Sequence, residues 1–323
     1  MNISVIMATY NGSCYIREQL VSILEQTILP TEIIVIDDCS DDNTLDIVNE
    51  IASEYSGIKW KISSNAENVG WKENFFQLIK MASGDLIFYC DQDDIWDVKR
   101  IEYSTSIFEK NSKIFCLSCA YEPINEYGDL LVEKSYNGKL KKISYGDKAA
   151  HSALGCLLVF NKKVRTVLLE TIEKKYFSIL PVDLAIAITA CILDGFYNIN
   201  LPFVKHIFHR FNVSNSINVA DNVEGSNLLE NKVTYIYYDL KIMDIFSCKY
   251  GFNNDSYEYK MLIDARANFF RTRNLLWIIK AFRYTSFDYR LALVLGDLAY
   301  FFGINKFAGK VYCKLEKLSA YFS

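Results

Sequence analysis

Short apolar runs alternate with longer stretches of helical spacing over residues 1–90, and this alternation constrains the fold more than any other sequence feature. The apolar runs are rich in β-branched residues and end in turn signals, which predicts buried strands. These strands are predicted at 3–8, 32–37, 58–62 and 85–90, with helices between them at 14–27, 43–55 and 72–82. Strands that alternate with helices predict an α/β fold built on a doubly wound, mostly parallel sheet.

The pattern continues less regularly over the rest of the chain and ends in helices. Further strands are predicted at 113–123, 153–161 and 203–211, helices at 97–112, 163–175 and 183–195, and a polar hairpin or loop at 124–144. From about residue 220 the spacing becomes helical to the end. The sequence therefore predicts a C-terminal helical extension after the α/β domain.

Polar residues follow each of the first four predicted strands. Thr9 and Tyr10 follow the first, Asp37 and Asp38 end the second, 63–65 follow the third, and 91–94 follow the fourth. Ligands of doubly wound sheets bind at the carboxyl ends of the strands. We therefore expect all four clusters to meet at one edge of the sheet.

The acids after the fourth strand, in "FYCDQDDIWD", point to a cation. Asp91 and Asp93 lie two apart on a bend, so both carboxylates can reach one oxygen-liganded ion such as Mg²⁺ or Mn²⁺. The plainer interpretation, capping of the next helix, suits Asp94 or Asp97. Neither a GxGxxG nor a GxxxxGK[ST] motif is present, so a bound nucleotide diphosphate would need a metal to neutralise it.

Four motifs together carry a resemblance to a known family. In order and spacing, "ISVIMATYNG", "EIIVIDDCSDDNT", "NVGWKENF" and "ASGDLIFYCDQDDIW" resemble the inverting family 2 glycosyltransferases, which have the A-type nucleotide-sugar fold. The "DQDDIW" form is similar to rhamnosyltransferase-like members that build bacterial surface polysaccharides. The resemblance covers residues 1 to about 215. It implies a catalytic domain at 1–218, with a nucleotide-sugar half at 1–112 and an acceptor-side half at 113–218, followed by a helical, basic region at 219–323.

The resemblance also implies roles for individual residues. It assigns donor binding to Thr9, Tyr10, Asp37 or Asp38, Asn68, Gly70, Lys72, Asp91 and Arg210. Asp93, with Asp91, is expected to hold Mn²⁺ or Mg²⁺, and Trp96 to pack. Asp183, in "LPVDLAIA", matches the catalytic base, although a carboxylate in the first turn of a helix is also stabilised by the helix dipole.

One motif departs from the family pattern. At "HRFNVSN" relatives often carry a histidine near the metal or diphosphate, whereas this chain has Asn212 there and His209 three residues earlier. Whether Asn212 or any histidine completes the metal site is therefore left open by the sequence. His151 and His206 are expected to be ordinary strand or loop residues.

The resemblance implies a nucleoside-diphosphate sugar as donor, with dTDP-rhamnose as a candidate, and a saccharide or lipid-diphosphate-linked acceptor. The product would belong to bacterial O-antigen or capsule synthesis. Two alternatives remain at this point: a non-catalytic nucleotide-sugar binding protein, and a sugar nucleotidylyltransferase. The second would need a Gly-rich phosphate loop, which "ATYNGSCY" lacks.

Charge and cysteine use suggest where the protein works. Residues 1–256 hold 24 Lys and Arg against 34 Asp and Glu, while residues 257–323 hold 11 against 5. Basic and apolar residues mix over 259–318, which fits either a solvated helical face or attachment to an anionic inner leaflet. No nucleic-acid motif accompanies the basic residues. The nine cysteines, including the pair Cys116 and Cys119, read as reduced thiols, and no transmembrane run or signal peptide is found, so we expect a cytoplasmic or peripheral protein.

Overall fold

The computed structural model describes residues 1–144, 147–151, 153–171, 181–209, 236, 254–283, 294–295 and 297–298. The chain divides into two compact units, which are described separately below. The first comprises Met1–Ser144 and Ala149–Asn222, and the second comprises Tyr145–Lys148 and Val223–Ser323.

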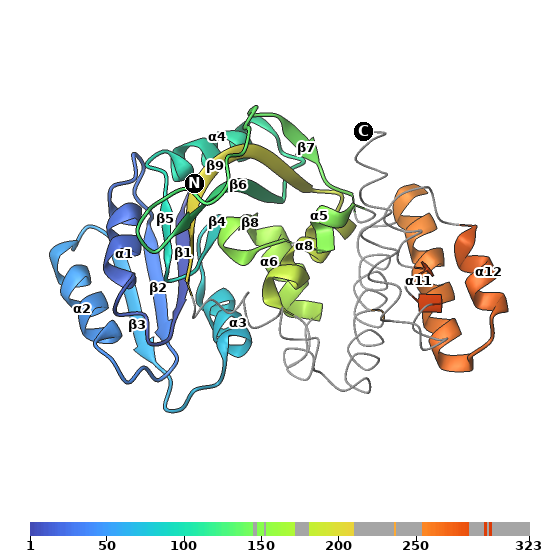
Figure 1. Cartoon of the computed structure of the whole chain (residues 1–323), viewed down its shortest axis with the longest axis horizontal. Helices are drawn as coiled ribbons and strands as arrows, with labels where there is room; N and C mark the ends of the chain where they lie inside the picture. Colours follow the sequence, from blue (N-terminus) through green and yellow to red (C-terminus); the bar gives the residue numbers. More distant parts are fainter. Residues whose placement is uncertain are drawn as a thin grey trace. The chain divides into compact units, whose positions relative to one another are not determined.

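The first unit is built on one mixed sheet whose strands run in the order β3-β2-β1-β4-β8-β6-β9-β5, with β7 paired to β9 (Figure 1). Its first four strands are β1 (Ile3–Thr9), β2 (Glu32–Asp37), β3 (Lys59–Ser64) and β4 (Leu86–Cys90). All neighbours among these four are parallel. The parallel α/β part predicted from the sequence is therefore confirmed, and it places the carboxyl ends of β1 to β4 at one edge.

Three helices connect the parallel strands: α1 (Ile16–Leu24), α2 (Thr44–Glu54) and α3 (Trp71–Met81). The chain moves outward from β1 to β2 and β3, and then returns to the other side of β1 for β4. Because such crossovers are right-handed, α1 and α2 cover one face of the sheet and α3 the opposite face (Figure 1). The reversal between β1 and β4 is the topological switch point, where this class of sheet binds its ligands.

The inner strands of the parallel part are apolar because helices cover both faces, whereas the edge strand β3 has no fully buried residue. Every residue of β2 and β4 is buried, including the acids Glu32 and Asp37 at the two ends of β2. Continuous apolar runs of this kind are typical of parallel strands rather than of half-exposed ones. The core they form positions the strand ends rigidly.

The second half of the sheet mixes both directions. Its strands are β5 (Asp94–Trp96), β6 (Cys116–Asn125), β7 (Leu140–Lys142), β8 (Leu158–Asn161) and β9 (Phe196–Phe208). β8 is antiparallel to β4 and β6, β5 is antiparallel to β9, and β6 is parallel to β9. Its helices are α4 (Arg100–Lys110), α5 (Lys148–His151), α6 (Lys162–Thr171) and α8 (Val182–Ile192), with a 3₁₀ turn η1 (Gly155–Leu157) before β8.

Two differences from the predicted elements matter for the site. The sequence placed Asp94 before a helix, whereas Asp94 begins the short strand β5. The late strand was expected from residue 203, but β9 begins at Phe196 and reaches Phe208.

Cys116 and Cys119 are both buried free thiols of β6.

The described helices of the second unit are α11 (Asn254–Thr272) and α12 (Leu276–Phe282), which pack against each other (Figure 1). Leu262, Ile263 and Phe269 of α11 are fully buried. Arg266 is also buried and donates to Asp297 at 2.6 Å. None of the described helices has the length and apolar character needed to cross a membrane.

Candidate active site

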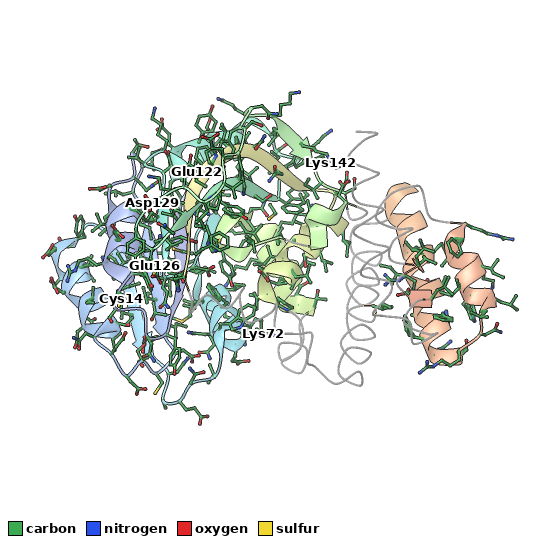
Figure 2. The ribbon with its side chains drawn as sticks, in the orientation of Figure 1. Cys14, Lys72, Glu122, Glu126, Asp129 and Lys142 are labelled. Atoms are coloured by element: carbon green, nitrogen blue, oxygen red, sulfur yellow. The ribbon has the colours of Figure 1, made fainter. Side chains whose placement is uncertain are left out.

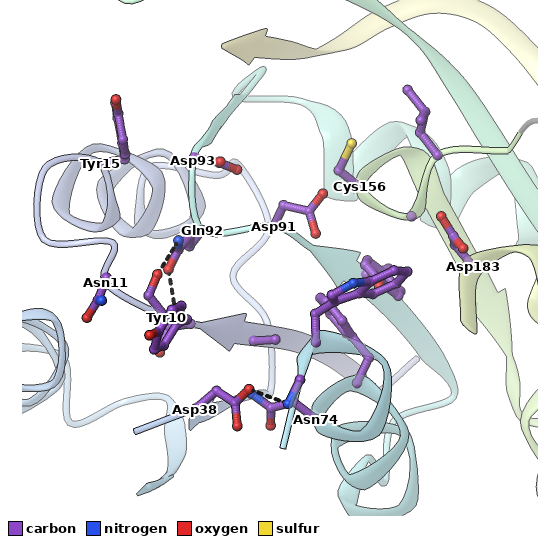
Figure 3. A pocket seen from close by; sticks show the side chains of 18 of the residues that line it. Tyr10, Asn11, Tyr15, Asp38, Asn74, Asp91, Gln92, Asp93, Cys156 and Asp183 are labelled. Carbon is purple, nitrogen blue, oxygen red and sulfur yellow. Dashed lines mark hydrogen bonds between the residues drawn. The ribbon is translucent and has the colours of Figure 1, made fainter. Parts of the chain in front are cut away.

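A pocket of about 770 Å³ lies at the carboxyl ends of the parallel strands (Figure 3). This volume falls in the range of small-molecule sites. Its lining includes Thr9, Tyr10, Asp38, Asn68, Gly70, Asp91, Asp93 and Asp183, all predicted as site residues. Residues more than a hundred positions apart therefore meet at the carboxyl ends of the parallel strands, where the sequence predicted a ligand site.

Asp37 holds the loop after β2 in place rather than facing the pocket. It accepts hydrogen bonds from Thr9 Oγ1 at 2.8 Å, Ser40 N at 2.8 Å and Ser40 Oγ at 2.6 Å. It is 1% exposed and is not among the residues that line the pocket. Of the two acids that the sequence left open for donor binding, the geometry favours Asp38.

Asp38 lines the pocket and shapes the loop that enters α3. Its oxygens accept from Asn65 Nδ2 at 2.8 Å, from Val69 N at 2.9 Å and from Gly70 N at 2.8 Å. Gly70 has φ +85°, a left-handed conformation that favours glycine. The "NVGW" motif therefore turns sharply around the Asp38 carboxylate and delivers Asn68 and Trp71 to the pocket.

Gln92 joins the end of β1 to the turn after β4. Its side chain accepts from Tyr10 N at 2.9 Å and donates to Tyr10 O at 3.0 Å (Figure 3). Tyr10 is 45% exposed at the pocket, so its ring is available to a ligand. This pair of bonds fixes the central residue of the Asp91–Asp93 turn to the neighbouring strand.

Asp93 contacts His209, which the sequence did not predict as a site residue. Asp93 Oδ2 lies 2.7 Å from His209 Nε2, and the His209 ring stacks on Tyr15 with centroids 4.4 Å apart. Tyr15 in turn donates to Glu126 at 3.3 Å. β9 ends at Phe208, so the strand itself delivers this imidazole to the acidic turn.

Asp94 and His206 form a buried pair beneath that turn. The two residues face each other in the β5–β9 register, and Asp94 Oδ1 lies 2.6 Å from His206 Nδ1. Burial alone would lower the pKa of His206, but its bond to Asp94 and the charges of Asp94, Asp91 and Asp93 raise that pKa above its usual value. Asp97 rather than Asp94 makes the local bond before α4, accepting from Lys99 N at 2.9 Å.

Arg100 places a positive charge behind the same turn. It is 1% exposed, donates to Cys156 O at 2.6 Å, and lies over the Trp96 ring at 3.9 Å from its centroid. Trp96 therefore packs, as expected, and does so against a guanidinium. Asp94, His206 and Arg100 are thus a buried layer of ionisable residues near the acidic turn.

Two sets of residues have the chemistry to hold a divalent metal. Burial and the neighbouring carboxylates of Asp94 and Asp93 raise the pKa of Asp91 well above its usual value. A cation would relieve that repulsion, and carboxylate oxygens suit Mn²⁺ and Mg²⁺, so the chemistry of Asp91 and Asp93 fits such an ion. His209 bonds to Asp93, but the ligand atoms of these three residues are not all within 4.8 Å of one another.

The second set is Asp94, Cys156 and His206, whose ligand atoms lie within 4.8 Å of one another. It fits less well. Asp94 and His206 already bond to each other, burial raises the pKa of the Cys156 thiol well above its usual value, and Arg100 adds a positive charge to the same residues. We therefore place the metal candidate at Asp91 and Asp93.

Asp183 lies across the pocket from the acidic turn, in the first turn of α8 (Figure 3). Burial raises its pKa to about 6, against hydrogen bonds from the backbone of Leu184 and Gly155 and the charge of Lys72. A carboxylate with a pKa just below neutrality is ionised at pH 7 and still accepts a proton readily. These are the properties of a general base.

The remaining predicted residues divide into two groups. Lys72 does not line the pocket; its charge acts on Asp183 instead. Arg210 and Asn212 lie outside the described residues, so their expected roles stay predictions. Asn74 was missed: it lines the pocket at 0% exposure, and its Oδ1 has no hydrogen-bond partner among the described residues.

The fold and the pocket define an α/β protein with an acidic ligand site at the switch point of its sheet. The sequence profile described as "Glycosyl transferase family 2" matches residues 4–168. The chain therefore belongs to glycosyltransferase family 2.

Individual relatives agree with this assignment. The "dTDP-rhamnosyl transferase RfbG" of Shigella flexneri is 43% identical over 99 residues, which are 30% of this chain and 34% of that protein. The "UDP-Glc:alpha-D-GlcNAc-diphosphoundecaprenol beta-1,3-glucosyltransferase WfgD" of Escherichia coli is 34% identical over 160 residues, 49% of this chain and 58% of that protein. The matches thus span about a third and somewhat over half of these two relatives.

The fold is also shared with solved structures. Residues 1–349 of S. aureus TarS in complex with UDP-GlcNAc match with a TM-score of 0.62 at 17% identity, covering 97% of this chain and 92% of that chain. The A-type glycosyltransferase fold with C-terminal helices, expected from the sequence, is therefore confirmed.

Proposed function

We propose that this protein transfers a sugar from a nucleoside-diphosphate donor to an acceptor hydroxyl, with inversion at the anomeric carbon. The observation that carries the proposal is the pairing, within one pocket, of an acidic turn fit for a metal–diphosphate and a half-buried carboxylate, Asp183, fit to be a base. Thr9, Tyr10, Asp38, Asn68 and Gly70 would receive the nucleoside end of the donor. The nearby Asn74 Oδ1 offers a further buried acceptor.

Asp91 and Asp93 would hold the Mn²⁺ or Mg²⁺ ion. A divalent cation held there would act as a Lewis acid that offsets charge on the departing diphosphate. Arg210, if it follows the family pattern, would add a positive charge to the same group. The buried layer of Asp94, His206 and Arg100 lies near the same turn.

Asp183 would act on the acceptor. It takes the proton from the acceptor hydroxyl while the oxygen forms a bond to the anomeric carbon. The bond from that carbon to the diphosphate oxygen breaks, and the diphosphate leaves with the electron pair. One displacement from the face opposite the leaving group inverts the centre, and no covalent intermediate on the protein is needed.

The relatives suggest the substrates. Similarity to the dTDP-rhamnosyl transferase supports dTDP-rhamnose as donor, and similarity to the glucosyltransferase supports UDP-glucose as the second candidate. The latter protein is named for a diphosphoundecaprenol-linked sugar, which supports a lipid-diphosphate-linked or oligosaccharide acceptor in surface polysaccharide synthesis. Such an acceptor would place the enzyme at the inner face of the cytoplasmic membrane.

The alternative is a nucleotide-sugar binding protein that has lost catalysis. Asp183 argues against it, because a carboxylate that lines a pocket and has a raised pKa is typical of functional sites. Membership of family 2 argues against the nucleotidylyltransferase alternative.

The Asp183→Asn variant tests the proposal. Turnover should fall by about 10²–10⁴-fold because base catalysis is lost, while donor affinity stays within about twofold because Asp183 does not hold the nucleotide. Diphosphate release and calorimetric titration of the donor measure the two quantities.

Asp194→Asn is the matched control, because Asp194 lies just beyond α8 with φ 61°, a conformation that asparagine tolerates. Its turnover should equal that of the wild type. Normal turnover in Asp183→Asn would refute the base assignment and leave the binding-protein alternative open.

A further inference from the structure

One side of α12 exposes apolar and basic residues together. The helix buries Ile278 and Ala281, at 3% and 0% exposure. At 100° per residue, Leu276, Ile279, Lys280 and Arg283 fall on the opposite side, and Leu275 and Phe282 flank them along one edge. All six are exposed, with Leu276 at 63% and Ile279 at 58%. We call these six residues the α12 face.

Four large apolar side chains within eight residues are more than the scattered exposure of an ordinary surface. Single exposed apolar residues need no explanation, whereas contiguous patches mark contact sites. Here Leu275, Ile279 and Phe282 follow each other at spacings of four and three, so they form one stripe. That stripe is therefore a candidate contact surface.

The charges around this stripe all have the same sign. Lys280 and Arg283 lie on the α12 face itself, and the exposed Arg271 and Arg273 lie just before it. The sequence contains no Asp or Glu between Asp264 and Asp288. Lys280 Nζ lies 4.1 Å from the centroid of the Trp277 ring, which adds an aromatic residue of the kind found at membrane interfaces.

A second exposed apolar segment, in the first unit, has the opposite charge. Tyr127, Leu130, Leu131 and Val132 are 88%, 50%, 48% and 56% exposed. Their neighbours include Glu122, Glu126 and Asp129, and Figure 2 shows these three acids along that segment. Exposed apolar residues of this protein are therefore not always accompanied by basic residues, and the combination is specific to the α12 face among these two segments.

We propose that the α12 face binds the surface of an anionic phospholipid bilayer. The helix lies flat, with Leu276 and Ile279 at the boundary of the acyl chains and the Lys280 and Arg283 side chains at the lipid phosphates. This inference rests on the proposed function, because it names the residues that would hold the enzyme at the membrane. The lipid-linked acceptor explains why the enzyme would bind there, but the binding itself does not require it. Vesicle binding requires neither donor nor turnover. Failure to bind vesicles and failure to transfer a sugar can therefore be told apart.

Flotation of the full-length protein with lipid vesicles tests the proposal. The wild type should float with vesicles of phosphatidylcholine and phosphatidylglycerol at low salt, and far less with pure phosphatidylcholine or at high salt. Leu276→Ser/Ile279→Ser should weaken partitioning by about tenfold or more, because it removes apolar area that the bilayer would bury. Lys280→Gln/Arg283→Gln should weaken it to a similar extent, because each basic residue near the surface contributes about fivefold. All four positions are exposed, so circular dichroism should show unchanged folding.

Leu131→Ser/Val132→Ser is the matched control, since it removes two equally exposed apolar side chains beside acids. It should partition like the wild type. The proposal is overturned if the wild type does not float with anionic vesicles, or if the α12 variants and the control bind equally. It is also overturned if light scattering shows a wild-type dimer that Leu276→Ser/Ile279→Ser dissociates, because the α12 face would then bind a second copy.

Discussion

Asp183 and Lys72 illustrate how single side chains set the chemistry of this pocket. Burial raises the pKa of Asp183 to about 6, and the Lys72 ammonium counteracts that rise. Burial in turn lowers the pKa of Lys72, while the Asp183 charge opposes this effect. The Lys72 charge therefore favours the ionised form of Asp183, while the donor contact that the resemblance implies for Lys72 stays a prediction.

Activity should therefore rise with pH through about 6, where Asp183 loses its proton. Lys72→Met removes the charge that favours the ionised form, so the pKa of Asp183 should increase by up to about one unit and the acid limb of kcat/KM should move to higher pH.

Lys80→Met is the control for this profile, because Lys80 lies in the last turn of the same helix, over the Phe76 ring. Its acid limb should stay where the wild type has it. An unchanged limb in Lys72→Met, together with weaker donor binding, would return Lys72 to the donor-binding role.

Residue identities in the acidic turn could be predicted, but their partners could not. Asp91 and Asp93 follow an apolar run, which is a local signal. His206 meets Asp94 only through the β5–β9 register, 112 residues away in sequence. His209 was set aside because family spacing places the histidine at position 212, whereas the end of β9 brings His209 itself to Asp93.

At the scale of elements, the two ends of β2 have different roles: the carboxyl end orders the site loop and the amino end stabilises the fold. Asp37, at the carboxyl end, organises the site loop, whereas Glu32, at the amino end, ties three segments together. Glu32 accepts from Ser4 Oγ at 2.6 Å, from Ser83 N at 2.7 Å, and pairs with Lys61 at 2.9 Å. Burial alone would raise the pKa of Glu32, but these bonds lower it to about 2.

Glu32→Gln should lower the free energy of unfolding by about 2 kcal/mol at pH 7, because charge-assisted bonds to a buried carboxylate are lost. The folded-state pKa of Glu32 lies below the unfolded value of about 4.3, so its stabilisation is present above that pH. The difference from wild type should therefore shrink as the pH falls from about 4 towards about 2. Urea unfolding at several pH values measures this.

Glu50→Gln is the matched control, since Glu50 pairs with Arg17 at 2.8 Å but is 56% exposed. It should cost less than about 1 kcal/mol. A loss in Glu32→Gln no larger than in Glu50→Gln, or one that does not depend on pH, would contradict this account of β2.

Element types in the parallel half followed from periodicity, because strands buried on both faces and amphipathic helices leave strong local patterns. The second half was harder. β5 has three residues and exists only because β9 pairs with it, and the early part of β9 contains Asn198, Asn200 and Pro202, which read as a loop. Long-range pairing overrides local preference in both strands.

At the scale of the whole molecule, charge is distributed unevenly along the sequence. The first 256 residues have ten more acids than bases, while the last 67 have six more bases than acids. This asymmetry can be counted from the sequence, but the exposure of individual side chains is needed to identify the residues of the α12 face. The acidic part, in turn, repels an anionic donor unless a cation offsets the carboxylates at the pocket.

The central claim is that the strand-end pocket binds a nucleoside-diphosphate sugar through a cation at Asp91 and Asp93. Asp93→Asn should lose this binding, whereas Asp85→Asn, at the amino end of the β4 segment and paired with Lys162, should keep it. A ligand that binds only the native state raises the melting temperature in proportion to its occupancy.

The most direct test is a thermal-shift panel of nucleotide sugars, including dTDP-rhamnose and UDP-glucose, with Mn²⁺ or with EDTA. In the wild type and in Asp85→Asn, one donor with Mn²⁺ should raise the melting temperature by about 5 °C or more at saturating concentration, and EDTA should abolish the shift. Asp93→Asn should show no shift. Equal shifts with EDTA and in Asp93→Asn, or no shift with any nucleotide sugar in the wild type, would contradict the claim.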